Sequence, residues 1–147
     1  MEPQATFSTC FGGPFMALDP SVYAKLLGEK IAKHHVKVWL VNTGWTGGPY
    51  GTGHRLEIGP TKAMLRAALS GKLDGVGMQV DPVFGLRVPR SCPDVPPDVL
   101  DPRSTWKDPA AYDRTARKLA GMFHENFAQY ADQVTSGVRA AGFRNPD

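Results

Sequence analysis

A glycine-rich stretch at residues 43–53 is the first place in this sequence where residue types and spacing favour ligand chemistry. It contains five glycines and one proline, which exclude regular secondary structure. A phosphate-binding loop needs glycines so that backbone N–H groups surround the phosphate, a lysine to neutralise it, and a Ser or Thr for magnesium. Gly48 and Gly53 have the required separation, but His54 replaces the lysine and Arg55 replaces the Ser or Thr. The motif therefore fails at both chemical positions.

The dinucleotide-binding fingerprint fails in the same stretch. Gly51-Thr52-Gly53 is followed by His54-Arg55-Leu56, without a third glycine. On pattern alone, a flexible connection is favoured over a ligand-binding loop. Trp45 leaves both interpretations open, because an indole in a polar loop either covers a pocket or anchors the loop.

The histidines and cysteines do not have the spacing of a zinc site. They are His34, His35, His54, His124, Cys10 and Cys92. His34 and His35 fall where a helix is predicted to end, and imidazoles there can satisfy free carbonyls. Both cysteines are interpreted as free thiols. Because nucleophile and base meet in space and not in sequence, no catalytic residue and no metal ligand is assigned.

Two helices that would position these residues have clear start signals. Asp19-Pro20 and Asp108-Pro109 each combine an N-cap residue with proline at the first helical position. The first helix should run about fifteen residues, and an apolar stripe from Tyr112 to Tyr130 predicts the second. Between them, Val36–Asn42 has the composition of a strand covered on both faces, with Trp39 in the core.

Shorter elements complete the predicted order. They are a strand at 55–58, a helix at 61–70 closing at Gly71, two strands at 76–80 and 83–88 that are expected to pair, an irregular surface segment at 89–106, and a short helix at 132–141.

Composition is that of a single soluble domain. The chain has 147 residues and 16.0 kDa, with 41% apolar and 21% charged residues. It shows no apolar run that would span a membrane and no signal peptide, so the cytoplasm is the expected location.

Charge and loop content narrow the expected function further. The net charge of +3 is small, and the sequence lacks the dense run of basic residues that nucleic-acid binding requires. Glycine and proline are abundant, at 16 and 13 residues, which predicts many loops. These observations predict an α/β domain with one loop of interest.

Several longer motifs resemble those of ATP-dependent phosphoenolpyruvate carboxykinase. The likeness runs in unbroken order over nearly the whole chain. The residues that carry it are Ala5–Phe15, Trp39-Leu40-Val41-Asn42-Thr43-Gly44-Trp45, Gly51–Arg55, Pro82–Leu86, Leu100-Asp101-Pro102-Arg103-Ser104-Thr105-Trp106 and Phe123–Phe127.

What the chain resembles is only the C-terminal part of that enzyme, roughly a quarter of it. The family converts oxaloacetate and ATP to phosphoenolpyruvate, ADP and CO2 in gluconeogenesis. The resemblance implies that residues 1–147 are an incomplete nucleotide-binding domain, with short mixed strands, packed helices and long loops. The family's P-loop, its Mg and Mn ligands and its oxaloacetate-binding residues would all lie upstream. Met1 stands where the family continues, which implies a truncated product, a split gene or a partial reading frame.

The resemblance also implies specific nucleotide contacts. In the family an arginine, the residue after it and a threonine six residues beyond the arginine hold the base, and these positions match Arg55, Leu56 and Thr61. A guanidinium plane can stack on adenine, a backbone group at Leu56 can read the base edge, and Thr61 can offer its hydroxyl. His54 departs from the family's lysine.

The expected function is therefore the adenine-binding side of the carboxykinase, inactive without the rest of the enzyme. The expected partners are ATP, the missing N-terminal portion and, in the full enzyme, oxaloacetate, with no nucleic acid and no membrane. The alternatives are a non-catalytic ATP-binding module and a structural remnant that folds only on the missing portion.

Overall fold

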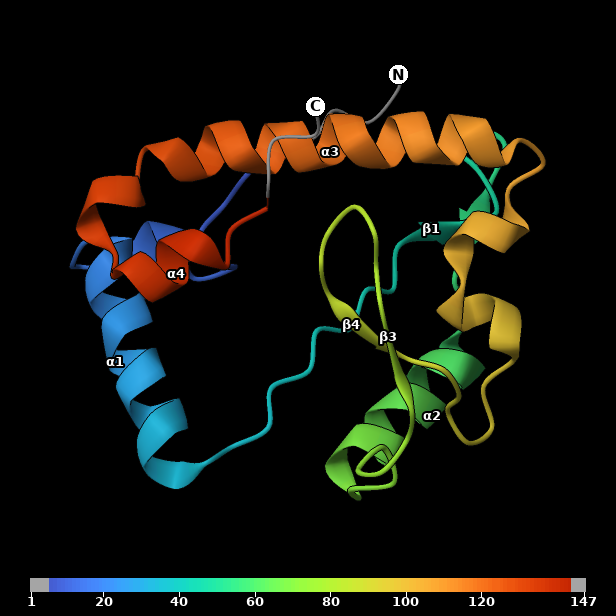
Figure 1. Ribbon diagram of the computed structural model, residues 1–147, viewed down its shortest axis with the longest axis horizontal. Helices are drawn as coiled ribbons and strands as arrows, with labels where there is room; N and C mark the ends of the chain where they lie inside the picture. The colour runs from blue at the N-terminus through green and yellow to red at the C-terminus, as the bar shows by residue number, and fades with distance from the viewer. Residues whose placement is uncertain (1–5, 144–147) are drawn as a thin grey trace.

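The structure is a computed structural model that describes residues 6–143. Helix α3 (Pro109–Ala128) runs along one side and bridges two parts of the chain (Figure 1). One part holds α1 (Pro20–His34) and α4 (Ser136–Ala140), and the other holds α2 (Ile58–Leu69) and both strand pairs. The strands are β1 (Trp45–Thr46), β2 (His54–Arg55), β3 (Met78–Val80) and β4 (Arg87–Pro89), and the 3-10 helices are η1 (Gly13–Phe15), η2 (Pro97–Leu100), η3 (Pro102–Thr105) and η4 (Ala131–Gln133).

The structure confirms both helix starts that carry Asp-Pro. The Asp19 carboxylate accepts the Ser21 N–H at 2.8 Å, and the Asp108 carboxylate accepts the Ala110 N–H at 2.9 Å. These bonds satisfy N–H groups that have no partner inside the helix. Helix α1 has the predicted fifteen residues and ends where His35 turns to a φ of 51°.

Helix α2 begins earlier than predicted. Gly59 and Pro60 were expected to break a strand at 55–58, but they lie in the first turn of α2. Proline is tolerated there because the N–H groups of the first turn have no intrahelical acceptor. The strand prediction is thus wrong beyond Arg55, whereas the predicted end is confirmed, with Gly71 at a φ of 73° after the C-cap.

The predicted pair of strands near residue 80 is present in shorter form. β3 and β4 are antiparallel, with Gln79 opposite Val88. The turn between them is held by the Asp81 carboxylate, which accepts the N–H groups of Val83 and Phe84 at 2.9 and 2.6 Å. An aspartate that bonds the backbone just beyond it is a common turn device.

The strand predicted at Val36–Asn42 is wrong. This segment is extended chain with no strand partner in the described residues, and it leads from α1 to the glycine-rich stretch (Figure 1). Val38 is 63% exposed and Leu40 is 78% exposed. A β-rich composition cannot form a strand by itself, because the ladder needs a neighbour for its hydrogen bonds.

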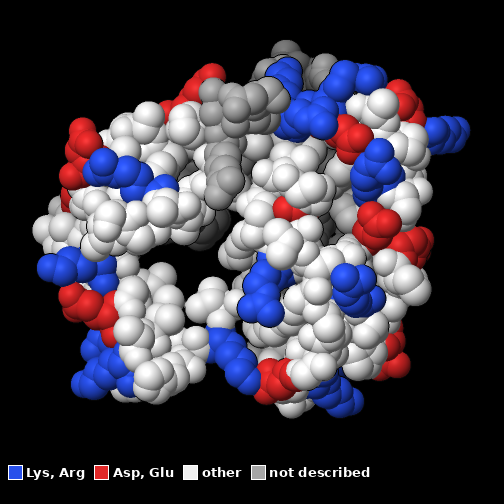
Figure 2. All heavy atoms as spheres, viewed as in Figure 1, with Lys and Arg blue, Asp and Glu red and all other residues white. Residues whose placement is uncertain are grey.

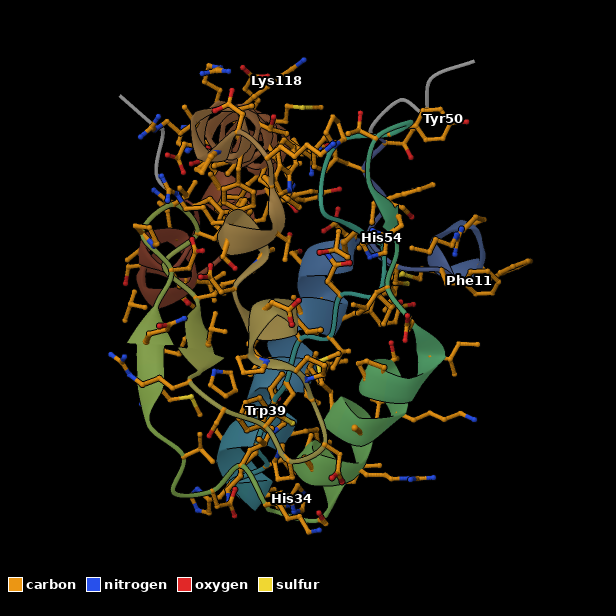
Figure 3. The ribbon with its side chains drawn as sticks, turned by 90° about the vertical axis from the view of Figure 1, so that its right-hand side faces the viewer. Phe11, His34, Trp39, Tyr50, His54 and Lys118 are labelled. Atoms are coloured by element: carbon orange, nitrogen blue, oxygen red, sulfur yellow. The ribbon has the colours of Figure 1, made fainter. Side chains whose placement is uncertain are left out.

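Trp39 is the exception within this segment. Its side chain packs against a small cluster of Ala67, Leu73 and Cys92, so the prediction that it joins the core is confirmed in this local sense. In Figure 3 Trp39 lies within the outline of the molecule, whereas Phe11 projects outward.

The remaining predictions hold in part. The segment at 89–106 is largely irregular, as predicted, but includes η2 and η3. The short helix predicted at 132–141 is divided into η4 and α4 by an extended Val134. Among residues 6–143, no helix has the length and apolar character that a membrane span requires. Met1 and Ala5, which entered the resemblance, lie outside the described residues.

An aromatic cluster joins segments that are far apart in sequence. The rings of Phe123 and Phe143 have centroids 4.9 Å apart, and Phe7 and Phe84 contact this pair at 5.1 and 5.5 Å. The cluster connects α3 to the turn between β3 and β4 and to both ends of the described chain. Such ring pairs stabilise beyond the area that they bury.

The buried core is small for a chain of this size. Among the described residues, only Ala67, Leu73, Cys92, Ala116 and Ala120 are buried apolar residues. The chain exposes 11202 Å² of surface. A folded monomer of 16.0 kDa exposes about 7,400 Å², so the excess is about 3,800 Å². Figure 2 shows an opening between the part that holds α1 and the part that holds the strand pairs.

Candidate nucleotide-binding site

The glycine-rich stretch folds into a β-hairpin, which corrects the prediction that it lacks regular structure. β1 and β2 are antiparallel, with Trp45 opposite Arg55 and Thr46 opposite His54. Glycines reverse the chain between them, since Gly47 has a φ of 75° and Gly51 a φ of 84°. Other residues rarely adopt this left-handed conformation, so the glycines that obscured the strands in the sequence are what allow them to pair.

The loop of the hairpin is internally bonded. The Pro49 carbonyl accepts the N–H groups of Thr52 and Gly53 at 3.0 and 2.8 Å. Gly53 passes so close to β1 that a Cβ there would lie 2.6 Å from the Thr46 oxygen. Tyr50 lies at the outer end of the hairpin and its ring makes an edge contact with Trp45, at a centroid distance of 5.6 Å (Figure 3). The stretch is therefore a folded element and not a flexible connection.

Arg55 is exposed on β2. Within the described residues, no carboxylate lies at ion-pair distance from its guanidinium. The side chain of Arg55 emerges on the same face of the hairpin as that of Trp45, because residues directly opposite in an antiparallel pair share a face. A planar cation beside an indole, both open to solvent, can receive an aromatic or anionic ligand.

Leu56 and Thr61 have part of their hydrogen-bonding capacity already used. The Leu56 N–H donates to the Gly44 carbonyl at 3.0 Å, which leaves the carbonyl as its backbone group for a ligand. The Thr61 hydroxyl donates to the Glu57 carbonyl at 2.9 Å, which leaves lone pairs on the hydroxyl oxygen. Both positions thus offer acceptors, and both lie in the short connection from β2 into the first turns of α2.

His54, labelled in Figure 3, lies opposite Thr46 in the residue pair next to the loop of the hairpin. A Cβ built on Gly47 would lie 3.2 Å from the His54 ring, so the imidazole packs over the start of the loop. A larger residue at Gly47 would have to displace the His54 ring slightly and adopt a φ of 75°, which is strained for any residue with a Cβ. This contact gives His54 a packing role where the family pattern has a lysine.

A neighbouring segment supports the hairpin, and sequence reasoning did not assign it to the site. The Thr105 hydroxyl of η3 accepts the Gly47 N–H at 3.2 Å. Two residues earlier, the Arg103 guanidinium makes a two-pronged ion pair with Asp113 of α3, at 2.8 and 2.9 Å. Hydrogen bonding from Arg103 lowers the pKa of Asp113 and, in return, raises that of Arg103. The only sequence signal for this role was the distinctive motif that contains both Arg103 and Thr105.

The other predicted candidates lie away from the hairpin. His34 and His35 end α1, and His124 Nδ1 lies 3.2 Å from the Phe143 carbonyl oxygen. Cys10 is exposed and Cys92 is buried, and both are free thiols as predicted. Residues 6–143 bring together no group of three or more His, Cys, Asp or Glu side chains that would hold a metal ion.

Comparison with known proteins decides the family. A sequence profile described as phosphoenolpyruvate carboxykinase matches residues 1–98, two thirds of the chain. The chain belongs to the phosphoenolpyruvate carboxykinase family. The matched range includes the hairpin, Leu56 and Thr61, and it ends within η2, before η3 begins.

Curated relatives extend the similarity of this carboxykinase-family chain to nearly its full length. It is 60% identical over 141 residues to phosphoenolpyruvate carboxykinase (ATP) 2 of Moorella thermoacetica, an alignment that covers 96% of the chain and 27% of the relative. It is 57% identical over 143 residues to the enzyme of Thermus thermophilus, with 97% and 27% covered. For an enzyme of Salinibacter ruber, the identity is 60% and the covered shares are 96% and 26%. The chain spans about a quarter of the length of these relatives.

Proposed function

We propose that residues 1–147 are the C-terminal part of the nucleotide-binding domain of an ATP-dependent phosphoenolpyruvate carboxykinase. Such an enzyme converts oxaloacetate and ATP to phosphoenolpyruvate, ADP and CO2. The observation that carries the proposal is the combination of about 60% identity over 96% of the chain with coverage of only 27% of the relative. The role of this chain is to bind the adenine end of ATP.

The hairpin and the start of α2 offer groups that suit adenine. The Arg55 guanidinium stacks on the base, with Trp45 beside it on the same face. The Leu56 carbonyl and the Thr61 hydroxyl oxygen are acceptors, because their N–H and O–H groups donate within the chain. The 6-amino group of adenine is a donor and matches them, whereas guanine presents a carbonyl at that position. ATP should therefore bind better than GTP.

The upstream part of the same enzyme is the proposed partner. It would supply the metal ligands for Mg and Mn, the phosphate-binding loop and the groups that hold oxaloacetate. The surface excess of about 3,800 Å² supports this, since a standard stable interface takes about 800 Å² from each partner. Exposed apolar side chains such as Leu26 and Leu27 of α1 and Leu40 are suited to that contact. The cytoplasmic location stays a prediction.

The adenine assignment is tested by titrating the 147-residue chain with ATP and GTP by calorimetry. Arg55→Ala should weaken ATP binding about fivefold to thirtyfold, the effect of losing a desolvated cation–π contact. Arg87→Ala is the matched control, because Arg87 is also an exposed strand arginine but lies on β4. Equal effects of the two substitutions, or equal binding of ATP and GTP, would contradict the assignment.

The enzymatic part is tested by oxaloacetate-dependent release of ADP. The chain alone should show none, and adding the upstream portion of a carboxykinase relative should restore turnover. Circular dichroism of the same mixture reports whether the chain gains structure on docking. Turnover by the isolated chain would refute the proposal that the metal, phosphate and oxaloacetate sites lie in the upstream part of the enzyme.

A further inference from the structure

The Thr105 hydroxyl makes one polar contact within η3 and two with the hairpin. It donates to the Pro102 carbonyl at 2.7 Å, which turns the oxygen lone pairs away from η3. The same oxygen accepts the Gly47 N–H at 3.2 Å and lies 3.5 Å from the Thr46 hydroxyl. Thr105 is half-buried, and its two contacts with the hairpin are partly shielded from competing water. A single hydroxyl thus joins segments 58 residues apart in sequence.

The bond from the Gly47 N–H to Thr105 lies directly after β1, where Gly47 sets the direction in which the chain enters the loop. Gly47 has a φ of 75°, and a Cβ there would lie 3.2 Å from the His54 ring and 3.9 Å from the Thr105 carbonyl oxygen. Fixing its N–H fixes the end of β1. Because β1 and β2 pair over only two residues each, their register rests on few bonds, of which the one from the Leu56 N–H to the Gly44 carbonyl restrains the opposite end of the pair from Gly47. That register sets Arg55 opposite Trp45.

At its other end, η3 is bonded to α3 through Arg103 and Asp113. The Arg103–Asp113 pair is bidentate, with Nε and one terminal nitrogen of Arg103 each bonded to a separate carboxylate oxygen. Bidentate geometry restrains orientation as well as distance. Asp113 belongs to the twenty-residue helix α3, so η3 and Thr105 are held against the longest element of the chain.

We propose that Thr105 is a positioning residue for nucleotide binding, and that its hydroxyl holds the hairpin in the arrangement that presents Arg55 to the base. The inference rests on the proposed function for the identity of the ligand, ATP. Thr105 does not touch the nucleotide in this proposal. It acts through Gly47 and the β1–β2 register.

The test uses the 147-residue chain with Thr105→Val, which keeps the shape of the side chain and removes the hydroxyl. Two readouts are measured: the hydrogen-exchange rate of the Gly47 amide and the Kd for ATP. Loss of one net hydrogen bond should speed exchange at Gly47 about fivefold and weaken ATP by a similar factor. Thr105→Ser, which retains the hydroxyl, should restore both values.

Thr115→Val is the matched control. The Thr115 hydroxyl also donates to a backbone carbonyl, that of Ala111 at 2.8 Å, but it lies on α3, and within residues 6–143 no hydrogen bond joins it to the hairpin. It should change neither readout. Unchanged Gly47 exchange in Thr105→Val would overturn the inference, as would an unchanged Kd for ATP in a chain where Arg55→Ala weakens binding. If Arg55→Ala has no effect, the proposed function fails, while Gly47 exchange still decides whether Thr105 holds the hairpin.

Discussion

Trp45 and Arg55 lie directly opposite each other in the β1–β2 pair, with both side chains exposed on one face of the hairpin. Opposite residues in an antiparallel pair have Cβ atoms about 5 Å apart, so the indole reports on whatever binds the guanidinium. The ring of Tyr50 contacts Trp45 edge-on. This arrangement provides an intrinsic optical probe at the proposed base site.

The first prediction concerns that probe. ATP should quench or shift the emission of the chain, and Trp45→Phe should abolish the change. Trp106→Phe is the control, since Trp106 packs against Tyr112 at a centroid distance of 5.5 Å, on the α3 side. A nucleotide response that survives Trp45→Phe and disappears with Trp106→Phe would place the base elsewhere.

The second prediction concerns the close approach at Gly53. Gly53→Ala puts a methyl group 2.6 Å from the Thr46 oxygen and should force the strands apart. The expected result is a loss of about 1–3 kcal/mol in the free energy of unfolding, together with weaker ATP binding. Gly59→Ala is the control, because open space surrounds that position and alanine favours a helix. Denaturant melts compare the variants, and equal stability of the two would contradict the expected clash.

Sequence patterns predicted those elements whose signals are local. The Asp19-Pro20 and Asp108-Pro109 caps specify helix starts within a few residues, and both helices begin where expected. The strand prediction for Val36–Asn42 failed because a strand needs a partner strand from elsewhere in the chain, and the sequence of the segment does not show whether one lies beside it. The hairpin was missed for a different reason. Its glycines, which turn the chain, predict irregular structure and so hide two very short strands.

The candidate site divides in the same way. Arg55, Leu56 and Thr61 came from the resemblance, and their roles toward ATP stay predictions. No local pattern could show that Thr105 reaches Gly47, because the contact depends on the path of the chain across 58 residues. The acceptor character of Leu56 and Thr61 also required the structure, since it follows from which of their donors are already used.

The third prediction concerns the pH dependence of the Arg103–Asp113 pair. Hydrogen bonding from Arg103 holds the pKa of Asp113 below its ordinary value of about 3.9. A lowered folded-state pKa stabilises the fold above the unfolded pKa, and this stabilisation is lost as the pH falls through the folded pKa. Thermal melts should show a lower melting temperature for Asp113→Asn than for the native chain at pH 7. The difference between the two melting temperatures should shrink below about pH 4. A difference in melting temperature that persists at pH 2 would contradict a role for the carboxylate charge.

The fourth prediction concerns the two thiols. Cys92 is 7% exposed, and burial raises its pKa, so both access and thiolate population are reduced. Cys10 is exposed. A disulfide reagent at neutral pH should modify one thiol quickly in the native chain, and Cys10→Ser should remove that fast phase. Rapid modification that remains in Cys10→Ser would mean that the cluster around Trp39 opens readily.

The exposed extended segment at Val36–Asn42 carries a further consequence for the chain in solution. It combines the composition of a central strand with backbone groups that no strand in the described residues engages. Such a segment is a template for β-pairing between molecules. At high concentration, copies of the chain should aggregate through this segment. Val38→Lys or Leu40→Lys should reduce that aggregation, because a charge in the segment opposes pairing between copies.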